Sequence, residues 1–143
     1  MPDAALANLS TEQRANFWQE VIERAEKFVF VATDTENNVV GFVNGGLERT
    51  HDPVYTAELY AFYLFEAQQG RGYGKALMRA TMEKFVEQGH DAMLLWVLSM
   101  NPARGFYETM GGQYLKTKPI EIGGETLEEV AYGWNGLLSF LTR

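Results

Sequence analysis

Three glycines within five residues mark the point where an apolar strand pattern gives way to a helical one. In the stretch AFYLFEAQQGRGYGKAL, residues 61–77, Gly70, Gly72 and Gly74 precede Lys75. The first N–H groups of a helix have no intrahelical partner and attract anions. Glycines are favoured there when the backbone itself must touch a ligand. The junction predicts an anion site at the start of a helix, and a plain strand-to-helix turn is the alternative.

Two common phosphate motifs do not fit these letters. A nucleotide P-loop requires a hydroxyl residue after its Gly-Lys pair, and Ala76 stands in that place. A dinucleotide fingerprint requires a further glycine where Lys75 or Leu77 stands, depending on the register. The loop reads instead Gln69-Gly70-Arg71-Gly72-Tyr73-Gly74, which is a Q-x-x-G-x-G pattern.

The segments around this loop predict a parallel βαβ unit. Residues 57–65 and 92–98 are apolar on both faces, as in buried strands. Between them, an apolar stripe with helical spacing runs from Gly72 to Gly89. A short helix is expected after the second strand, through PARGFYETM.

The rest of the chain predicts antiparallel pairs and one more helix. Residues 28–34 and 39–47 predict one hairpin, and residues 112–134 predict another around a Gly-Gly pair. Apolar spacing after a capping-box pattern predicts an amphipathic helix over residues 10–27. The fold class is therefore α/β (α+β), with a mixed, largely antiparallel sheet of about six strands, one parallel βαβ unit and helices on both faces.

Composition narrows the class of protein. A chain of 143 residues predicts one domain over residues 1–143. The absence of cysteine excludes thiolate zinc sites and cysteine nucleophiles, and two separated histidines do not predict a metal site. A net charge of −7 disfavours nucleic acid and slightly favours a cationic partner. No apolar run predicts a membrane span or a secretory signal, so a cytoplasmic location is expected.

The Q-x-x-G-x-G loop resembles the coenzyme A pyrophosphate loop of the GNAT superfamily of N-acetyltransferases. The likeness extends through ELYAFYLFEAQQGRGYGKALM and LLWVLSMNPARGFYETMGG, and covers residues 28–135. It implies an acetyl-CoA dependent N-acetyltransferase without a metal, acting on a small-molecule or peptidic primary amine. Direct attack in a ternary complex is expected, because no cysteine is present to form an acyl-enzyme.

The same resemblance implies roles for particular residues. Glu58 is expected as the general base and Tyr107 as the general acid at the coenzyme A sulfur. Each has a structural alternative: Glu58 could face solvent or a surface lysine, and Tyr107 could simply pack. The cofactor contacts are expected from Phe62, Tyr63, Leu64, Gln69, Gly70, Arg71, Gly72, Tyr73, Gly74, Lys75 and Asn101.

Several points stay open at this stage. The N-terminal strand and helix of the usual fold are expected to be missing, since little precedes Ser10. The acceptor pocket could then be open or completed by a second subunit in a homodimer. A non-catalytic coenzyme A or acyl-CoA sensor is the alternative function, and a domain whose loop binds nothing is a third. The acceptor amine is not identified.

Overall fold

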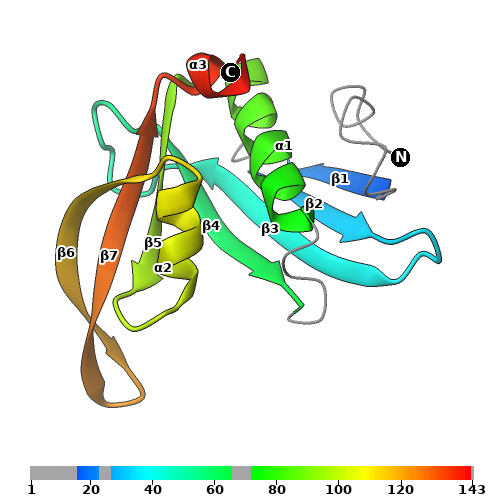
Figure 1. The fold of residues 1–143 in the computed structure, drawn as a ribbon. Coiled ribbons are helices and arrows are strands. Elements are labelled where there is room, and N and C mark those ends of the chain that lie inside the picture. The colour runs from blue at the N-terminus through cyan, green and yellow to red at the C-terminus, as the bar shows by residue number, and fades with distance from the viewer. Residues whose placement is uncertain (1–15, 23–26, 66–71, 143) are drawn as a thin grey trace.

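One mixed sheet with helices packed against it organises the molecule (Figure 1). The computed structural model describes residues 16–22, 27–65 and 72–142. Its strands lie in the order β1-β2-β3-β4-β5-β7-β6, and of these neighbours only β4 and β5 are parallel. The predicted mixed, largely antiparallel sheet is confirmed, with seven strands described where about six were expected. The elements are β1 (Asn16–Ile22), β2 (Lys27–Thr33), β3 (Val39–Leu47), β4 (Ala57–Leu64), α1 (Tyr73–Glu87), β5 (Ala92–Leu98), α2 (Ala103–Thr109), β6 (Gln113–Ile122), β7 (Glu125–Asn135) and α3 (Leu137–Leu141).

The predicted βαβ unit is present as β4, α1 and β5. The helical stripe is buried as expected, with Leu77 and Phe85 both fully inaccessible. The Phe85 ring meets the Phe28 ring of β2 edge to face at 5.2 Å between centroids. Truncating such a buried aromatic side chain costs about 3–5 kcal/mol, so this contact anchors α1 to the sheet. The helix ends before Gly89, which has a φ of +94°.

Both predicted hairpins are also present. In the β2–β3 turn, Asp34 Oδ1 accepts hydrogen bonds from the backbone N–H groups of Glu36, at 2.8 Å, and Asn38, at 3.0 Å. This side chain adds to the backbone hydrogen bonds between Asp34 and Asn38 and between Asn37 and Asp34, and it stabilises the turn that joins the two strands. In the β6–β7 turn, Gly123 and Gly124 both have positive φ values, which glycine adopts at little cost.

The helix predicted over residues 10–27 is wrong where the structure describes it. Residues 16–22 form β1 instead, paired antiparallel with β2 from Asn16↔Thr33 to Ile22↔Lys27. The segment NFWQEVI is rich in aromatic and β-branched residues, and the edge of β2 offers unpaired backbone groups. Strand pairing therefore overrides the helical spacing, and β1 supplies an N-terminal strand of the kind expected to be missing. The expected capping box at Ser10 and Gln13 lies outside the described residues.

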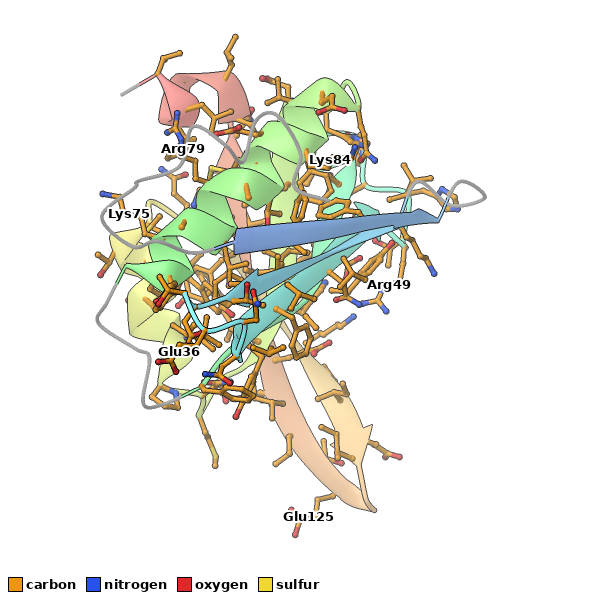
Figure 2. All side chains as sticks on the ribbon, turned by 90° about the vertical axis from the view of Figure 1, so that its right-hand side faces the viewer. Glu36, Arg49, Lys75, Arg79, Lys84 and Glu125 are labelled. Atoms are coloured by element: carbon orange, nitrogen blue, oxygen red, sulfur yellow. The ribbon has the colours of Figure 1, made fainter. Side chains whose placement is uncertain are left out.

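The two faces of the sheet differ in what covers them. Alternate residues such as Leu59 and Leu95 join the core under the helices, and Tyr107 of α2 belongs to the same core. All the helices of the described segments pack on this one face, whereas helices were expected on both. We call the opposite face, which carries Arg49, Glu58, Tyr60 and Trp96, the helix-free face. Figure 2 shows Arg49 across the sheet from Lys75 and Arg79 of α1.

Candidate active site

The parallel strands β4 and β5 pair over only three residues and then separate. Their ladder begins at Ala57↔Met93 and ends at Leu59↔Leu95. At the same level the β3–β4 ladder shifts from Asn44↔Ala61 to Gly45↔Leu59, which leaves Tyr60 as an extra residue. Such a bulge bends and twists a strand. The rest of β4 therefore turns away from β5.

A cavity of about 600 Å³ lies beside the separated part of β4. Its walls come from the end of β4, the start of α1 and the segment that leads into α2. These three elements are far apart in sequence and meet only because β4 and β5 diverge. The lining residues are Phe62, Tyr63, Leu64, Gly72, Gly74, Lys75, Asn101, Pro102, Ala103, Phe106 and Tyr107.

The start of α1 forms one end of this cavity. Gly72 is the N-cap residue and has a φ of +85°, a left-handed conformation that side-chain-bearing residues rarely adopt. The first turn of α1 contains no acidic residue, and Lys75 lines the cavity. The positive end of the helix dipole and a lysine together favour an anion here.

Gly74 has a second reason to be glycine. A Cβ atom placed on Gly74 would lie 3.2 Å from the Phe106 ring of α2, closer than such contacts normally are. The Phe106 ring in turn packs on Phe62 of β4 at 5.6 Å between centroids. Gly74 thus allows α2 to approach α1 and to close the apolar wall of the cavity.

The structure brings together most of the residues expected to hold a cofactor. Phe62, Tyr63, Leu64, Gly72, Gly74, Lys75 and Asn101 all line the cavity. Tyr73 is not among the lining residues and is buried in the core. Gln69, Gly70 and Arg71 lie outside the described residues. The contacts that these residues make with a ligand stay predictions.

Sequence reasoning missed three residues of the cavity wall, Pro102, Ala103 and Phe106. They belong to the segment NPARGFY, where the sequence predicts a short helix. The sequence does not predict which side of that helix faces α1. The pair Gly74 and Phe106, a missing side chain opposite a large ring, is the signal that could have identified it.

Asn101 connects α2 to the cavity. Its Oδ1 atom accepts a hydrogen bond from the backbone N–H of Ala103 at 2.8 Å, which satisfies one donor at the start of α2. Asn101 therefore has a structural role at the start of α2. Because Oδ1 is held in this way, the amide orientation is fixed beside the cavity that Asn101 also lines.

Tyr107 lines the inner wall and is only 6% exposed. Its ring makes edge-to-face contacts with Phe62, at 6.2 Å, and Trp134, at 6.4 Å between centroids. Burial raises the pKa of Tyr107 to about 12, because the anionic phenolate is poorly solvated there. The hydroxyl is thus protonated at neutral pH, and the ring packs as the structural alternative expected.

Glu58 is placed differently from the residues above. It is 2% exposed, but it is not among the residues that line the cavity and lies on the helix-free face. Arg49 Nη2 lies 2.6 Å from Glu58 Oε2, and Arg49 Nε and its backbone N–H donate to Oε1 at 3.3 and 3.2 Å. The hydrogen bond to Glu58 raises the pKa of Arg49 above its usual value. The structural alternative for Glu58 named solvent or a surface lysine, whereas the structure pairs the carboxylate with an arginine.

Arg49 was not identified from the sequence. It follows β3 in a loop, and only the register Gly46↔Glu58 brings that loop opposite the start of β4. The guanidinium also lies over the Tyr60 ring, 4.7 Å from its centroid. A spacing of nine residues between an arginine and a glutamate carries no local signal, so this pair could be found only with the strand register in hand.

Two negative findings complete the description. Within residues 16–22, 27–65 and 72–142, no group of three or more His, Cys, Asp or Glu side chains could hold a metal ion. None of the helices in these segments has the length and apolar character to cross a membrane.

The sequence matches known acetyltransferases over most of its length. A profile described as the Acetyltransferase (GNAT) family matches residues 3–111. The uncharacterized N-acetyltransferase YuaI of Bacillus subtilis (strain 168) is 34% identical over 142 residues, which cover 99% of this chain and 80% of that protein.

Solved structures agree in fold. A protein of Acinetobacter baylyi ADP1 assigned as an acetyltransferase aligns with a TM-score of 0.65 at 21% identity, over 76% of this chain and 63% of its own. The Salmonella typhimurium protein yncA, likewise assigned as an acetyltransferase and solved with its cofactor acetyl-CoA, aligns with a TM-score of 0.64 at 23% identity, over 76% of this chain and 64% of its own. The chain thus spans less than two thirds of the length of these two structures, and the likeness concerns the fold.

Proposed function

Because the chain belongs to the Acetyltransferase (GNAT) family and is an N-acetyltransferase, we propose that it moves the acetyl group of acetyl-CoA to a primary amine by direct attack in a ternary complex. The observation that carries this proposal is the cavity between the start of α1 and the diverging strands. Residues 1–143 act as one acetyltransferase domain, and the acceptor is a small-molecule or peptidic amine.

The cavity has the chemistry that this cofactor requires. The start of α1, with Gly72 as its cap and Lys75 beside it, suits the diphosphate. The ladder between β4 and β5 ends at Leu59, so the backbone of Phe62 and Tyr63 on that side is outside the strand pairing. A pantetheine arm can add to such an edge as an extra strand. Asn101 supports the same arm through its fixed amide.

Tyr107 and Glu58 are the residues proposed to act in the reaction. Acetyl-CoA, when bound, would supply a thioester whose acetyl group passes to the amine nitrogen while coenzyme A leaves as a thiolate, which takes its proton from water afterwards. Tyr107 donates a hydrogen bond to the departing sulfur. The phenol has a pKa of about 12, which is roughly 3.5 pKa units above that of an ordinary thiol. Complete transfer of its proton to the departing thiolate is therefore energetically unfavourable. The general-acid role is thereby refined to stabilisation of the thiolate.

Glu58 accepts the proton of the acceptor ammonium, directly or through water. Arg49 occupies both carboxylate oxygens in this structure, so Glu58 becomes available only when the guanidinium moves. The Arg49 side chain is 64% exposed, against 3% for that of Glu58. The arginine is therefore the partner that can leave.

Two measurements together test the proposed function. Calorimetry should detect acetyl-CoA binding, and thiol release with mass spectrometry of the products should detect acetylation in a library of primary amines. Tight binding without turnover of any amine would favour the coenzyme A sensor and overturn the proposal. Absence of binding at millimolar acetyl-CoA would overturn both functions. The cytoplasmic location and the homodimer remain predictions from the sequence.

A further inference from the structure

Residues of the helix-free face also border the place where β4 separates from β5. Tyr60 and Trp96 are the first residues beyond the last paired residues, Leu59 and Leu95. Leu59 and Leu95 point into the core, so their neighbours point to the helix-free face. An acceptor amine that approaches from this face therefore passes the Tyr60 and Trp96 rings.

Each of these two rings carries a cation. The Arg49 guanidinium lies 4.7 Å from the centre of the Tyr60 ring. Lys118 Nζ lies 4.1 Å from the centre of the Trp96 ring, and Lys116 Nζ lies 5.7 Å from it. Such contacts hold long cationic side chains in place while leaving their charge available.

Carboxylates on and near this face lie beside each of these cations. Glu58 pairs with Arg49, and Glu129 Oε1 lies 3.4 Å from Lys118 Nζ and within electrostatic range of Arg49. Lys116 adds a further positive charge and lies within electrostatic range of Asp52. The net charge of −7 of the whole chain therefore does not describe the surroundings of Glu58.

The other charged groups near this face have contacts of their own. Glu48 is turned into its own loop, where its carboxylate accepts hydrogen bonds from Thr50 and from the backbone N–H of Asp52. Asp52 accepts from the backbone N–H groups at the end of that loop. Lys27 Nζ lies 5.7 Å from the Tyr60 ring centre, on the side away from β5. The groups left to meet an acceptor are Glu58 and the cations at the two rings.

We propose, resting on the proposed function, that the acceptor is an α-amino acid and that Arg49 binds its carboxylate. The acceptor ammonium would take the place of the guanidinium at Glu58, while the guanidinium turns to the carboxylate one carbon away. An arginine matches a carboxylate in a planar, two-point geometry. The substrate thereby uncovers the base that removes its proton. A polyamine brings no anion, and it would meet the cations at Tyr60 and Trp96.

A matched substrate series tests this inference in the wild-type protein. Each L-amino acid is compared with its α-carboxamide, which keeps the side chain and the amine but removes the negative charge. Thiol release should give a kcat/KM at least about tenfold higher for the acid than for the amide of the preferred side chain, since a charged hydrogen bond is lost. Equal or faster acetylation of the amides, or a preference for polyamines, would overturn the inference.

Variants of Arg49 locate the effect. Arg49→Gln should lower the ratio of kcat/KM for the amino acid to kcat/KM for its amide by about tenfold or more, because only the acid binds the guanidinium while both substrates need Glu58. Arg49→Lys should fall between the two, since lysine keeps the charge and loses the planar fork. Arg79→Gln is the control, because Arg79 lies on α1 across the sheet and pairs with Glu83. Equal losses for acid and amide in Arg49→Gln would contradict a role in binding the carboxylate.

The two failures can be told apart. If the protein binds acetyl-CoA and acetylates amines that lack a carboxylate, the inference fails and the proposed function stands. If no amine or amino acid is acetylated although acetyl-CoA binds, both fail. Unfolding midpoints of the Arg49 variants show whether they fold. Should Arg49→Gln not fold, because Glu58 is then buried without its partner, Arg49→Lys and the wild-type series decide the question.

Discussion

The cavity under α1 and α2 and the helix-free face are the two regions of the proposed site, and they are built on opposite principles. The cavity is closed by apolar and glycine contacts, such as Gly74 against Phe106, that leave no charged pair to rearrange. The helix-free face is built from charged groups, and its central carboxylate, Glu58, is covered by Arg49. The cavity has its shape before a ligand binds. On the helix-free face, Glu58 must exchange Arg49 for the acceptor in the proposed reaction.

This difference has a physical reason. A cofactor that is the same in every turnover favours a rigid cavity, because little ordering then has to occur on binding. The exposed partner of an ion pair can be exchanged for another cation without leaving the buried carboxylate unpaired. The exchangeable partner, Arg49, thus stands where the variable substrate is proposed to enter. The five predictions that follow probe each region against the other.

The largest effect is expected at Glu58. Glu58→Gln removes the proposed base and should lower kcat by about 1,000-fold, within the range usual for general-base catalysis. The loss should be greatest at lower pH, where little of the amine is unprotonated in solution. Affinity for acetyl-CoA should not change, because Glu58 does not line the cavity. Steady-state kinetics from pH 6 to 10 and calorimetry measure the two quantities.

A neighbouring carboxylate provides the control for Glu58. Glu48 is 7% exposed and satisfies loop hydrogen bonds, so Glu48→Gln should lower stability with at most a few-fold change in kcat. A kcat for Glu58→Gln within a few-fold of wild type would show that Glu58 only pairs with Arg49, and the helix-free face would lose its proposed catalytic part.

The second effect concerns Tyr107 in the cavity. Tyr107→Phe should lower kcat by about 10- to 100-fold, which corresponds to the loss of one hydrogen bond to a charged sulfur. The pKa of Tyr107 is about 12, so the phenol stays protonated and the ratio of wild-type to variant kcat should be constant from pH 6 to 10. A ratio that changes steeply across this range would contradict a role as a neutral donor.

The same pKa predicts how Tyr107 affects stability. Its folded value is raised from about 10 to about 12, so the unfolded chain ionises first as pH rises. The contribution is fully present below pH 10 and is lost as pH passes toward 12. The free energy of unfolding of wild type should therefore fall by about 2 kcal/mol more than that of Tyr107→Phe over this interval. Denaturant titrations at fixed pH values measure the difference, and parallel curves would show that the phenol is not buried.

The third effect tests the start of α1. Gly72→Ala should cost about 1–2 kcal/mol of stability, because alanine is strained at a φ of +85°. It should also weaken acetyl-CoA binding by about tenfold if the backbone at this turn holds the diphosphate. Gly89→Ala is a matched control, with a φ of +94° at the other end of α1 and open space around it. It should lose similar stability and no affinity. An equal loss of affinity in both variants would show that the backbone at Gly72 does not hold the diphosphate.

Much of the fold and the cavity could be predicted from the sequence, because their determinants are local. The glycine loop, the stripe of α1 and the NPARGFY segment are each recognised from residues within one continuous stretch of sequence. The prediction failed at β1, where pairing with β2 outweighed the helical spacing of Trp18 and Val21. It also could not find the partner of Glu58, because Arg49 meets it only through the register of β3 and β4. The register between two strands depends on both strands, so neither segment alone predicts it, whereas local spacing can be seen within one segment.

The smallest effect separates two roles of Asn101 at the edge of the cavity. Asn101→Ala removes the side-chain hydrogen bond to the Ala103 N–H at the start of α2 and should cost about 1 kcal/mol of stability, whereas Asn101→Ser keeps an accepting oxygen and should cost little. If the side-chain amide also supports the pantetheine arm, both variants should bind acetyl-CoA about fivefold more weakly, as expected for one neutral hydrogen bond. Thermal unfolding and calorimetry separate the two quantities. Normal affinity in the serine variant would show that Asn101 serves α2 alone, so that the cavity relies on backbone and apolar contacts on this side.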